Sequence, residues 1–304
     1  MLEIAIMIEG QNGLTWPRWQ RIARLVEDAG FIGLFRSDHF TNSNPPELES
    51  LELWTSLTWL ACNTERIEFG PLVTPFSFRH PVHTTRMASA VDDLSKGRLV
   101  LGLGAGWNER EHHLFGFDLL QPGPRFERFN EGMEVVTRLL RSDEPAIFEG
   151  QYYQLRGATL LPRPQRPGGP RILIGGNGLQ RTLSYVARYA DEWNCVSLTP
   201  QEFTNRNMKL DEMLHVAGRS PESVRRSMMT GCVFGKDNAA LKEKIAARGK
   251  SLEQLQQDGV VAGSMDQIKK QLRELDEVGL QRIMLQWLDL DDLESLEALA
   301  KGVL

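Results

Sequence analysis

The sequence places a carboxylate and an imidazole side by side where an apolar segment ends. Asp38 and His39 follow the apolar run Phe31–Phe35 within the sequence RSDHF. Histidine titrates near neutral pH, so it is well suited to give or take a proton during a reaction. A turn-capping aspartate beside a surface imidazole would have the same spacing, and both interpretations stay open. Asp38 and His39 are therefore candidate catalytic residues.

Proline and glycine interrupt the next apolar segment. Gly70 and Pro71 precede Leu72, and a second proline, Pro75, follows shortly after. Proline cannot donate to a strand ladder, so this composition predicts a bulge rather than a continuous strand. A bulge there would direct backbone at a flat ligand, whereas a plain exit from strand to loop is the simpler alternative.

Two glycine-rich segments could hold a negatively charged ligand. The first contains Gly104, Ala105, Gly106 and Asn108, in a G-x-G-x-G spacing that is not the dinucleotide-binding fingerprint. Glycines allow backbone N–H groups to approach an anion closely. The second segment consists of Gly175, Gly176, Asn177 and Gly178, directly before a helix that we expect to begin near Leu179. Free N–H groups at a helix start favour phosphate, although a tight turn would use the same residues.

A further cluster of polar residues is a weaker candidate. Glu109, Glu111, His112 and His113 lie within five positions of one another. Adjacent histidines cannot both face one ion from a regular helix, so we expect no metal site here.

Apolar runs alternate with amphipathic stretches along the whole chain. Eight runs are expected to be strands, and each is followed by an expected helix. The strands are Leu2–Glu9, Phe31–Ser37, Arg66–Val73, Arg98–Leu103, Arg171–Ile174, Glu192–Val196, Ser227–Phe234 and Arg282–Trp287. The clearest helices are Trp16–Ala29, Leu51–Cys62, Phe126–Leu140, Arg181–Tyr189, Pro200–Ala217 and Leu293–Gly302. Nearly continuous apolar strands indicate a parallel sheet that is buried on both faces.

This alternation predicts an α/β fold, a (β/α)8 TIM barrel formed by residues 1–304 as a single domain. A doubly wound open sheet is the alternative, but the count of eight favours the closed barrel. An insertion rich in proline and glycine, residues 143–169, precedes the fifth strand. In such a barrel, active residues come from the carboxyl ends of the strands, which is where all the candidates above lie.

Composition excludes several classes of protein. The 304 residues carry a formal charge of −5, which argues against a nucleic-acid partner. No uncharged apolar run is long enough to span a bilayer, and the N-terminus lacks the pattern of a signal peptide. Three separated cysteines indicate neither a disulfide framework nor a zinc site. We therefore expect a cytoplasmic protein with no membrane association.

Taken together, these segments resemble the bacterial-luciferase-like superfamily, in particular its class that uses the deazaflavin coenzyme F420. The resemblance extends over essentially the whole chain. The segments that carry it are Ser37–Phe40, Leu72–Pro75, Arg79–Pro81, Gly102–Glu109, Phe148–Tyr153, Pro164–Pro167, Ile174–Gly176 and Ala187–Asn194.

The resemblance implies a tricyclic ring across the mouth of the barrel. A cis peptide bond after the third strand would support the ring; it is expected at Pro71–Leu72, with Gly70–Pro71 as the alternative. The loops Gly104–Asn108 and Gly175–Gly178 would hold the ribityl chain and the phosphate. Asp38 and His39 would face the ring, with His39 as the proton donor or acceptor and Asp38 orienting it or contacting the ring edge.

The function implied is hydride transfer between coenzyme F420 and a small-molecule substrate by a homodimer. Family members that act on sugar phosphates carry an acidic residue where this chain is aligned with Trp107, so a more apolar substrate is expected. One alternative is an FMN-dependent monooxygenase that uses O2 and reduced flavin from a partner reductase. Others are a non-redox barrel enzyme acting on a phosphorylated metabolite and a flavin-binding protein without catalysis.

Overall fold

Most strands of the protein form one nearly closed barrel. The structure is a computed structural model that describes residues 1–304. Its main sheet contains β1 (Glu3–Ile8), β2 (Gly33–Arg36), β3 (Glu68–Pro71), β4 (Thr74–Pro75), β5 (Val100–Gly104), β8 (Arg171–Gly175), β9 (Glu192–Val196), β10 (Arg225–Val233), β11 (Val261–Ala262) and β12 (Arg282–Gln286). All the pairs in this sheet are parallel, and β1 lies between β2 and β12.

The third strand of the barrel is split in two. Its first half, β3, pairs with β2, and its second half, β4, pairs with β5. A single bridge between Phe69 and Leu99 joins β3 to the start of β5 and closes the ring. The predicted TIM barrel is therefore confirmed, with β3 and β4 together occupying one of its eight positions.

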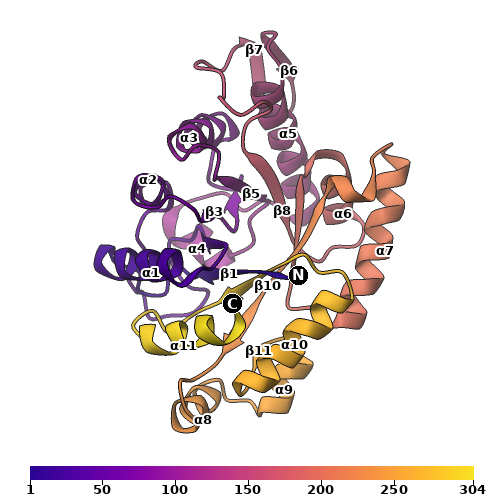
Figure 1. Ribbon diagram of the computed structural model, residues 1–304. Coiled ribbons are helices and arrows are strands. Elements are labelled where there is room, and N and C mark those ends of the chain that lie inside the picture. The colour runs from indigo at the N-terminus through magenta and orange to yellow at the C-terminus, as the bar shows by residue number, and fades with distance from the viewer.

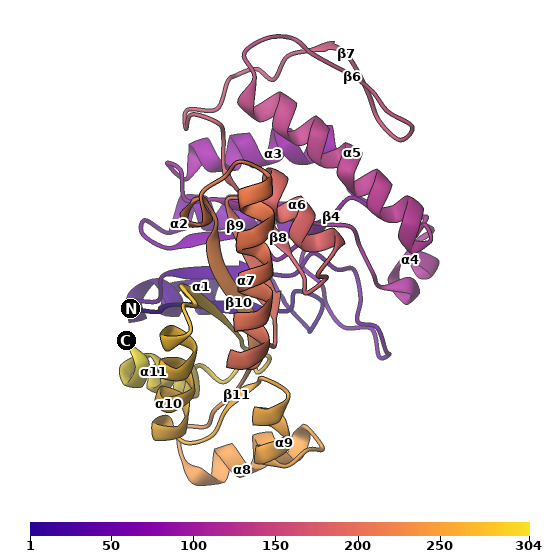
Figure 2. The same ribbon diagram turned by 90° about the vertical axis from the view of Figure 1, so that its right-hand side faces the viewer.

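Helices surround the barrel (Figure 1). They are α1 (Trp16–Ala29), α2 (Leu53–Asn63), α3 (Pro81–Leu94), α4 (Glu109–Phe115), α5 (Pro122–Arg141), α6 (Arg181–Tyr189), α7 (Pro200–Val216), α8 (Asn238–Ala247), α9 (Leu252–Gln257), α10 (Met265–Glu277) and α11 (Leu293–Val303), with a short 3-10 turn at Pro221–Ser223. Figure 2 shows α6 and α7 on the outer face of the sheet, and α8, α9 and α10 in the lower part of the view. None of these helices is both long and apolar enough to cross a bilayer.

Local sequence explains why α1 forms and ends where it does. Trp19, Ile22, Ala23 and Val26 recur at helical spacing and are buried against the sheet. Gly30 then adopts φ 98°, a left-handed conformation that ends the helix at low cost.

Strand alternation separates two apolar layers. In β1, Ile4, Ile6 and Ile8 belong to the large cluster of 62 buried residues between sheet and helices. Ala5 and Met7 belong instead to a cluster of seven residues inside the barrel. Successive side chains of a strand point to opposite faces, which accounts for this division. The inner cluster forms an apolar floor beneath the mouth of the barrel.

The structure corrects one predicted feature of the third strand. The strand was expected over Arg66–Val73, with a bulge at its proline and glycine residues and a cis bond at Pro71–Leu72 or Gly70–Pro71. The ladder does break after Pro71, but the cis bond is Leu72–Val73, one residue further along the chain.

The segments outside the barrel alternation differ more from the expectation. Residues 143–169 contain an antiparallel hairpin, β6 (Ala146–Glu149) and β7 (Gln154–Ala158), which stands apart from the barrel (Figure 1). The long helical region expected before Val278 is three helices with β11 between α9 and α10. Helix α4 was not predicted as a separate element.

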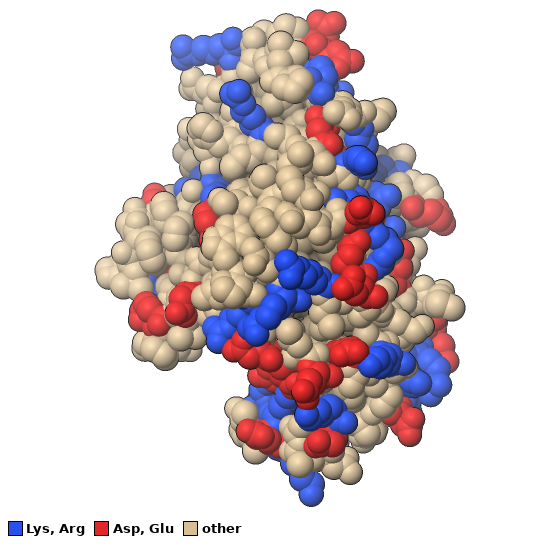
Figure 3. All heavy atoms as spheres, turned by 60° about the vertical axis from the view of Figure 1, so that its left-hand side comes forward, with Lys and Arg blue, Asp and Glu red and all other residues tan.

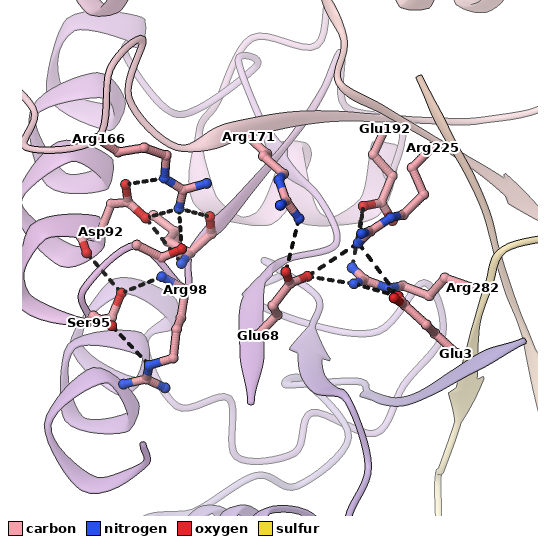
Figure 4. Close-up of polar contacts among 12 residues, drawn as sticks. Glu3, Glu68, Asp92, Ser95, Arg98, Arg166, Arg171, Glu192, Arg225 and Arg282 are labelled. Carbon is pink, nitrogen blue, oxygen red and sulfur yellow. Dashed lines mark hydrogen bonds and ion pairs between the residues drawn. The ribbon is translucent and has the colours of Figure 1, made fainter. Parts of the chain in front are cut away.

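Charged side chains are distributed unevenly between surface and interior. On the face shown in Figure 3, acidic and basic side chains are intermixed, and a broad part of that face is uncharged. At the N-terminal end of the barrel, strand starts contribute a partly buried network of ion pairs (Figure 4). In this network, Arg282 Nη2 lies 2.5 Å from Glu68 Oε2, and Arg282 Nη1 lies 3.3 Å from Glu192 Oε2.

Candidate functional site

A cavity of about 490 Å³ opens at the C-terminal ends of the strands. Its lining comes from the ends of β1, β2, β5, β8, β9 and β10 and from the loops that follow them. The lining includes Met7, Glu9, Gln11, His39, Leu72, Val73, Gly104, Ala105, Gly106, Trp107, Glu111, His112, Phe126, Gly175, Gly176, Thr182 and Asn194. The cavity is therefore where parallel strand ends converge, as expected for a barrel enzyme.

His39 lies in the cavity wall and is held by Glu111. The distance from His39 Nδ1 to Glu111 Oε2 is 2.7 Å, and Glu111 is fully buried. Because a carboxylate only accepts hydrogen bonds, Nδ1 carries the proton in this pair and Nε2 is left to exchange one. The ring of Trp107 meets His39 edge to face at 5.6 Å between centroids.

Burial and charge act on the His39 imidazole in opposite directions. Burial alone would lower the pKa of His39. The hydrogen bond and charge of Glu111, together with the charges of Glu9 and Asp38, outweigh burial and raise the pKa above its ordinary value. The pair therefore favours a protonated His39 near neutral pH.

Asp38 does not orient His39, so that predicted role is wrong. Asp38 Oδ2 accepts from the hydroxyl of Thr74, and Asp38 Oδ1 accepts from Arg79 Nη2 at 2.8 Å. Adjacent residues of an extended segment point to opposite sides, so His39 faces the cavity and Asp38 faces away from it. Asp38 instead ties the end of β2 to the split third strand, and it is not part of the cavity lining.

Three glycines surround the side chain of Val73. A Cβ atom on Gly104 would lie 2.6 Å from Val73 Cγ2, one on Gly102 would lie 3.1 Å from Cγ1, and one on Gly175 would lie 3.3 Å from Cγ1. The first distance is an overlap and the other two are tight. The glycines at the ends of β5 and β8 thus leave the space that Val73 fills beside the cavity.

The segment before α6 meets the cavity at one side. Gly175 and Gly176 line it, and Gly176 has φ 127°. Asn177 and Gly178 do not line it; both polar groups of the Asn177 amide are hydrogen-bonded to the backbone of Val196. Thr182, in the first turn of α6, completes this side of the wall.

The other predicted residues divide between lining and support. Leu72, Gly104, Ala105 and Gly106 line the cavity, whereas Pro71 belongs to the strand beneath it. Asn108 begins α4: its Oδ1 accepts from the Glu111 backbone N–H at 3.3 Å.

Sequence reasoning missed two residues of α4. Glu111 and His112 were considered only as part of a metal cluster, yet both are buried and line the cavity. His112 Nδ1 donates to the Asn108 carbonyl at 2.7 Å, and both His112 Nε2 and Glu111 Oε1 are buried without a protein partner. The N-cap Asn108, followed by polar residues three and four positions further along the helix, is the signal that could have revealed them.

A smaller pocket of about 220 Å³ adjoins the cavity. It shares Glu9, Gln11, His39 and Trp107 with the larger cavity. Its other walls come from the loops after β1, β2 and β12 and from Asn108. His39 therefore lines both of these adjoining spaces.

A sequence profile described as luciferase-like monooxygenase matches residues 3–298, nearly the whole chain. The chain belongs to this family. The resemblance inferred from the segment order is thereby confirmed, and with it the assignment of the fold.

Curated relatives of the chain include F420-dependent enzymes. An F420-dependent glucose-6-phosphate dehydrogenase of Kineococcus radiotolerans is 28% identical over 72% of this chain and 64% of its own length. A phthiodiolone/phenolphthiodiolone dimycocerosates ketoreductase of Mycobacterium kansasii is 30% identical over 64% of this chain and 52% of its own length. The chain therefore matches less than two thirds of these relatives.

Solved structures share the fold over the full chain. An F420-dependent secondary alcohol dehydrogenase superposes with a TM-score of 0.86 at 17% identity, covering 100% of this chain and 99% of the other. A monooxygenase from Streptomyces bottropensis superposes with a TM-score of 0.81 at 19% identity, covering 99% and 98%. At these identities, the likeness describes the barrel alone.

Proposed function

We propose that this protein is an oxidoreductase that moves a hydride between coenzyme F420 and a small organic substrate. The observation that carries the proposal is the His39–Glu111 pair, at 2.7 Å, in the wall of a cavity of about 490 Å³ at the barrel mouth. Family membership and the F420-dependent relatives support the choice of cofactor. FMN is the alternative cofactor.

The residues of the cavity fit a flat polar ring. Leu72 and Val73 supply an apolar wall, and the glycines of β5 and β8 beside Val73 add no side chains to it. Glu111 Oε1 and His112 Nε2, both buried and unpartnered, are polar atoms that a bound ring or substrate would satisfy. We expect Leu72, Val73, Gly104–Gly106 and Gly175–Gly176 to hold the ring and its side chain.

When bound, a deazaflavin supplies the hydride chemistry, and the protein supplies position and protonation. His39 holds a proton at Nδ1 against Glu111 and exchanges another at Nε2 with the substrate oxygen. Glu111 fixes the tautomer and stabilises the protonated ring, while the inner apolar cluster excludes water from below.

The cofactor is tested by titrating the purified protein with F420 and with FMN. We expect F420 to bind at the lower concentration, measured by fluorescence of the deazaflavin and of the flavin. If FMN saturates the protein at much lower concentration, the F420 assignment is wrong, and a monooxygenase reaction with a partner reductase becomes the better proposal.

The phosphate of the cofactor is proposed to lie at Gly175–Gly178, before α6. Gly176→Val would introduce a branched side chain at φ 127°, facing the cavity and Thr182. We expect F420 affinity to fall at least about tenfold, because a backbone approach is blocked. Gly123→Ala, at a position where a Cβ meets nothing within 4 Å, is the control. Unchanged affinity in a folded Gly176→Val protein would place the phosphate elsewhere.

A further inference from the structure

The smaller pocket beside His39 is lined by side-chain amides rather than by cations. Its lining is Glu9, Gln11, Asn12, His39, Thr41, Asn42, Ser43, Trp107, Asn108, Gln286 and Leu288. Neither this pocket nor the larger cavity has a lysine or arginine in its lining. A phosphate or carboxylate in the smaller pocket would therefore meet no lysine or arginine of its lining, whereas such anions are usually held by Arg or Lys. Arg110, which donates to Thr41 Oγ1 at 3.2 Å and to the Asn42 carbonyl at 3.0 Å, is already paired with Glu47.

Three amides in this pocket have their orientation fixed by the protein. Asn12 Nδ2 donates to the Leu288 carbonyl at 3.2 Å, and Asn42 Nδ2 donates to the Gln11 carbonyl at 3.2 Å. Gln286 Nε2 donates to Glu9 Oε1 at 2.6 Å. Each partner is an acceptor, so the nitrogen of each amide must be the atom that faces it.

The oxygen atoms of these amides are therefore the groups left for a ligand. Asn12, Asn42 and Gln286 each keep a side-chain oxygen that accepts no hydrogen bond from the protein, and the carboxylate of Glu9 belongs to the same lining. Gln11, by contrast, is fully engaged: its Oε1 accepts from Ser37 Oγ and its Nε2 donates to Glu9. The free groups of the pocket are thus mainly acceptors.

We propose that this pocket is the substrate site and that it takes an uncharged compound bearing several hydroxyl groups. Hydroxyl groups donate to the free amide oxygens, and no charge has to be neutralised. An anionic substrate would meet the Glu9 carboxylate and three carbonyl dipoles, all of which repel it. The positive charge of a protonated His39 is already paired with Glu111 at 2.7 Å. His39, in the wall shared with the larger cavity, contacts both spaces. The proposal deepens the function above and rests on it for the role of His39.

The proposed substrate differs in charge from the one for which a curated relative is named. The Kineococcus relative is named for glucose 6-phosphate, a substrate with a doubly charged phosphate. Trp107, which is 61% exposed at the rim, offers an uncharged aromatic surface beside the amides. The more apolar substrate expected from Trp107 differs from this proposal, because the free amide oxygens of the pocket favour hydroxyl groups.

Binding is tested on the full chain by saturation-transfer NMR with glucose, myo-inositol and glycerol, each compared with its monophosphate. We expect signals from the uncharged polyols and at least about tenfold weaker binding of each phosphate. The proposal is overturned if a phosphate binds as well as its parent polyol, or if no polyol gives a signal.

Variants of Asn42 locate the site. Asn42→Leu keeps the size of the side chain and removes the acceptor, so polyol binding should weaken about tenfold. Asn42→Lys should invert the preference toward the phosphates. Asn44→Leu, two residues along and outside both linings, is the matched control and should bind polyols as the wild type does. Equal binding by Asn42→Leu and Asn44→Leu would refute the location.

Cofactor titration separates this proposal from the proposed function. Asn42 does not line the larger cavity, so Asn42→Leu should bind F420 with unchanged affinity, read from deazaflavin fluorescence. If the wild type binds neither F420 nor FMN, the proposed function fails, while the NMR comparison of polyol and phosphate still decides the charge of the ligand.

Discussion

At the scale of single residues, the His39–Glu111 pair joins two elements that are distant in sequence. His39 follows β2, Glu111 lies in α4, and the Oε2 atom that His39 contacts also accepts from the Phe40 backbone N–H at 3.3 Å. One carboxylate oxygen thus fixes both the imidazole and the chain beside it. The other oxygen, Oε1, has no protein partner and stays available in the cavity.

Removing the imidazole should affect rate more than binding. We expect His39→Ala to lower turnover by about 10²–10⁴-fold, the usual contribution of an acid–base group, with a smaller change in F420 affinity. His80→Ala is the control, because His80 caps α3 and does not line the cavity. Steady-state kinetics and fluorescence titration of both variants make the comparison; near-normal turnover of His39→Ala would exclude His39 as the proton carrier.

The pH dependence should reveal the role of Glu111. The effect of Glu111 outweighs that of burial and raises the pKa of His39. In the wild type, His39 should therefore stay protonated at pH values above 6.5, the ordinary pKa of histidine. In Glu111→Gln, burial remains and the charge is gone, so the pKa should fall and the corresponding limb of the pH–rate profile should move to lower pH. NMR titration of the His39 ring measures the same shift without catalysis. A limb that stays in place in Glu111→Gln would show that Glu111 only supports the fold.

The sequence predicted His39 but not its partner. Alternation along an extended chain could have shown that Asp38 and His39 cannot both face the site. Glu111 could not have been paired with His39 from spacing, because 72 residues separate them and only the folded barrel brings α4 over β2. Long-range side-chain pairs of this kind depend on packing that local patterns do not encode.

At the scale of elements, the split third strand depends on the glycines of its neighbours. Gly104→Ala would place a methyl group 2.6 Å from Val73 Cγ2, and overpacking of this kind typically costs about 1–3 kcal/mol. We expect lower stability and weaker F420 binding, because Val73 and Leu72 would have to move into the cavity. Adding Val73→Ala should restore both quantities, which urea unfolding and titration of the single and double variants would measure. Additive losses in the double variant would contradict this account.

The elements themselves were predicted well wherever one period dominated. The sequence located β9 and α6 with their observed bounds, because apolar runs and helical spacing there are unambiguous. It misplaced the cis bond by one residue, because the prolines near the bulge do not indicate which peptide bond is cis. It also merged α8, α9 and α10, because short consecutive helices have the same local pattern as one long helix. Capping boxes at Ser251 and Ser264 mark the starts of α9 and α10 and could have divided that region.

At the scale of the whole molecule, the inserted segment 143–169 suggests how two chains could associate. Ile147 in β6 and Leu161 after β7 are each 65% exposed, although both are large and apolar. We expect a homodimer that covers them, so light scattering should give twice the chain mass of 34.4 kDa. Replacing both residues with Asp should yield the monomer, whereas Val216→Asp, at the end of α7, should not. A wild-type mass of one chain would refute the prediction.

The opposite end of the barrel should govern stability rather than catalysis. Arg282, almost fully buried, holds Glu3, Glu68 and Glu192 together (Figure 4). Arg282→Met would leave the buried Glu192 carboxylate without its principal counter-charge, which typically costs about 3–5 kcal/mol. Arg171→Met, which removes a half-exposed partner of Glu68 at 3.0 Å, should cost no more than about 1 kcal/mol. Urea unfolding measures both, and F420 affinity should stay unchanged because the site lies at the other mouth.

The pH dependence of this defect has a definite sign. Burial raises the pKa of Glu192 above 4.5 even though Arg282 opposes it, so the native state takes up this proton at higher pH than the unfolded chain does. Without Arg282 the pKa of Glu192 should rise further, and acidification from neutral pH toward about 5 should stabilise the variant.

Glu68, in the same network, behaves in the opposite way. Burial would raise the pKa of Glu68, but the charges of Arg282, Arg225 and Arg171 outweigh burial and lower that pKa in the wild type. The stability that Glu68 contributes is therefore lost only as the pH falls below 4.5. The difference in unfolding free energy between wild type and Arg282→Met should narrow from pH 7.5 to pH 5, and a constant difference would mean that Glu192 is already neutral in the native protein.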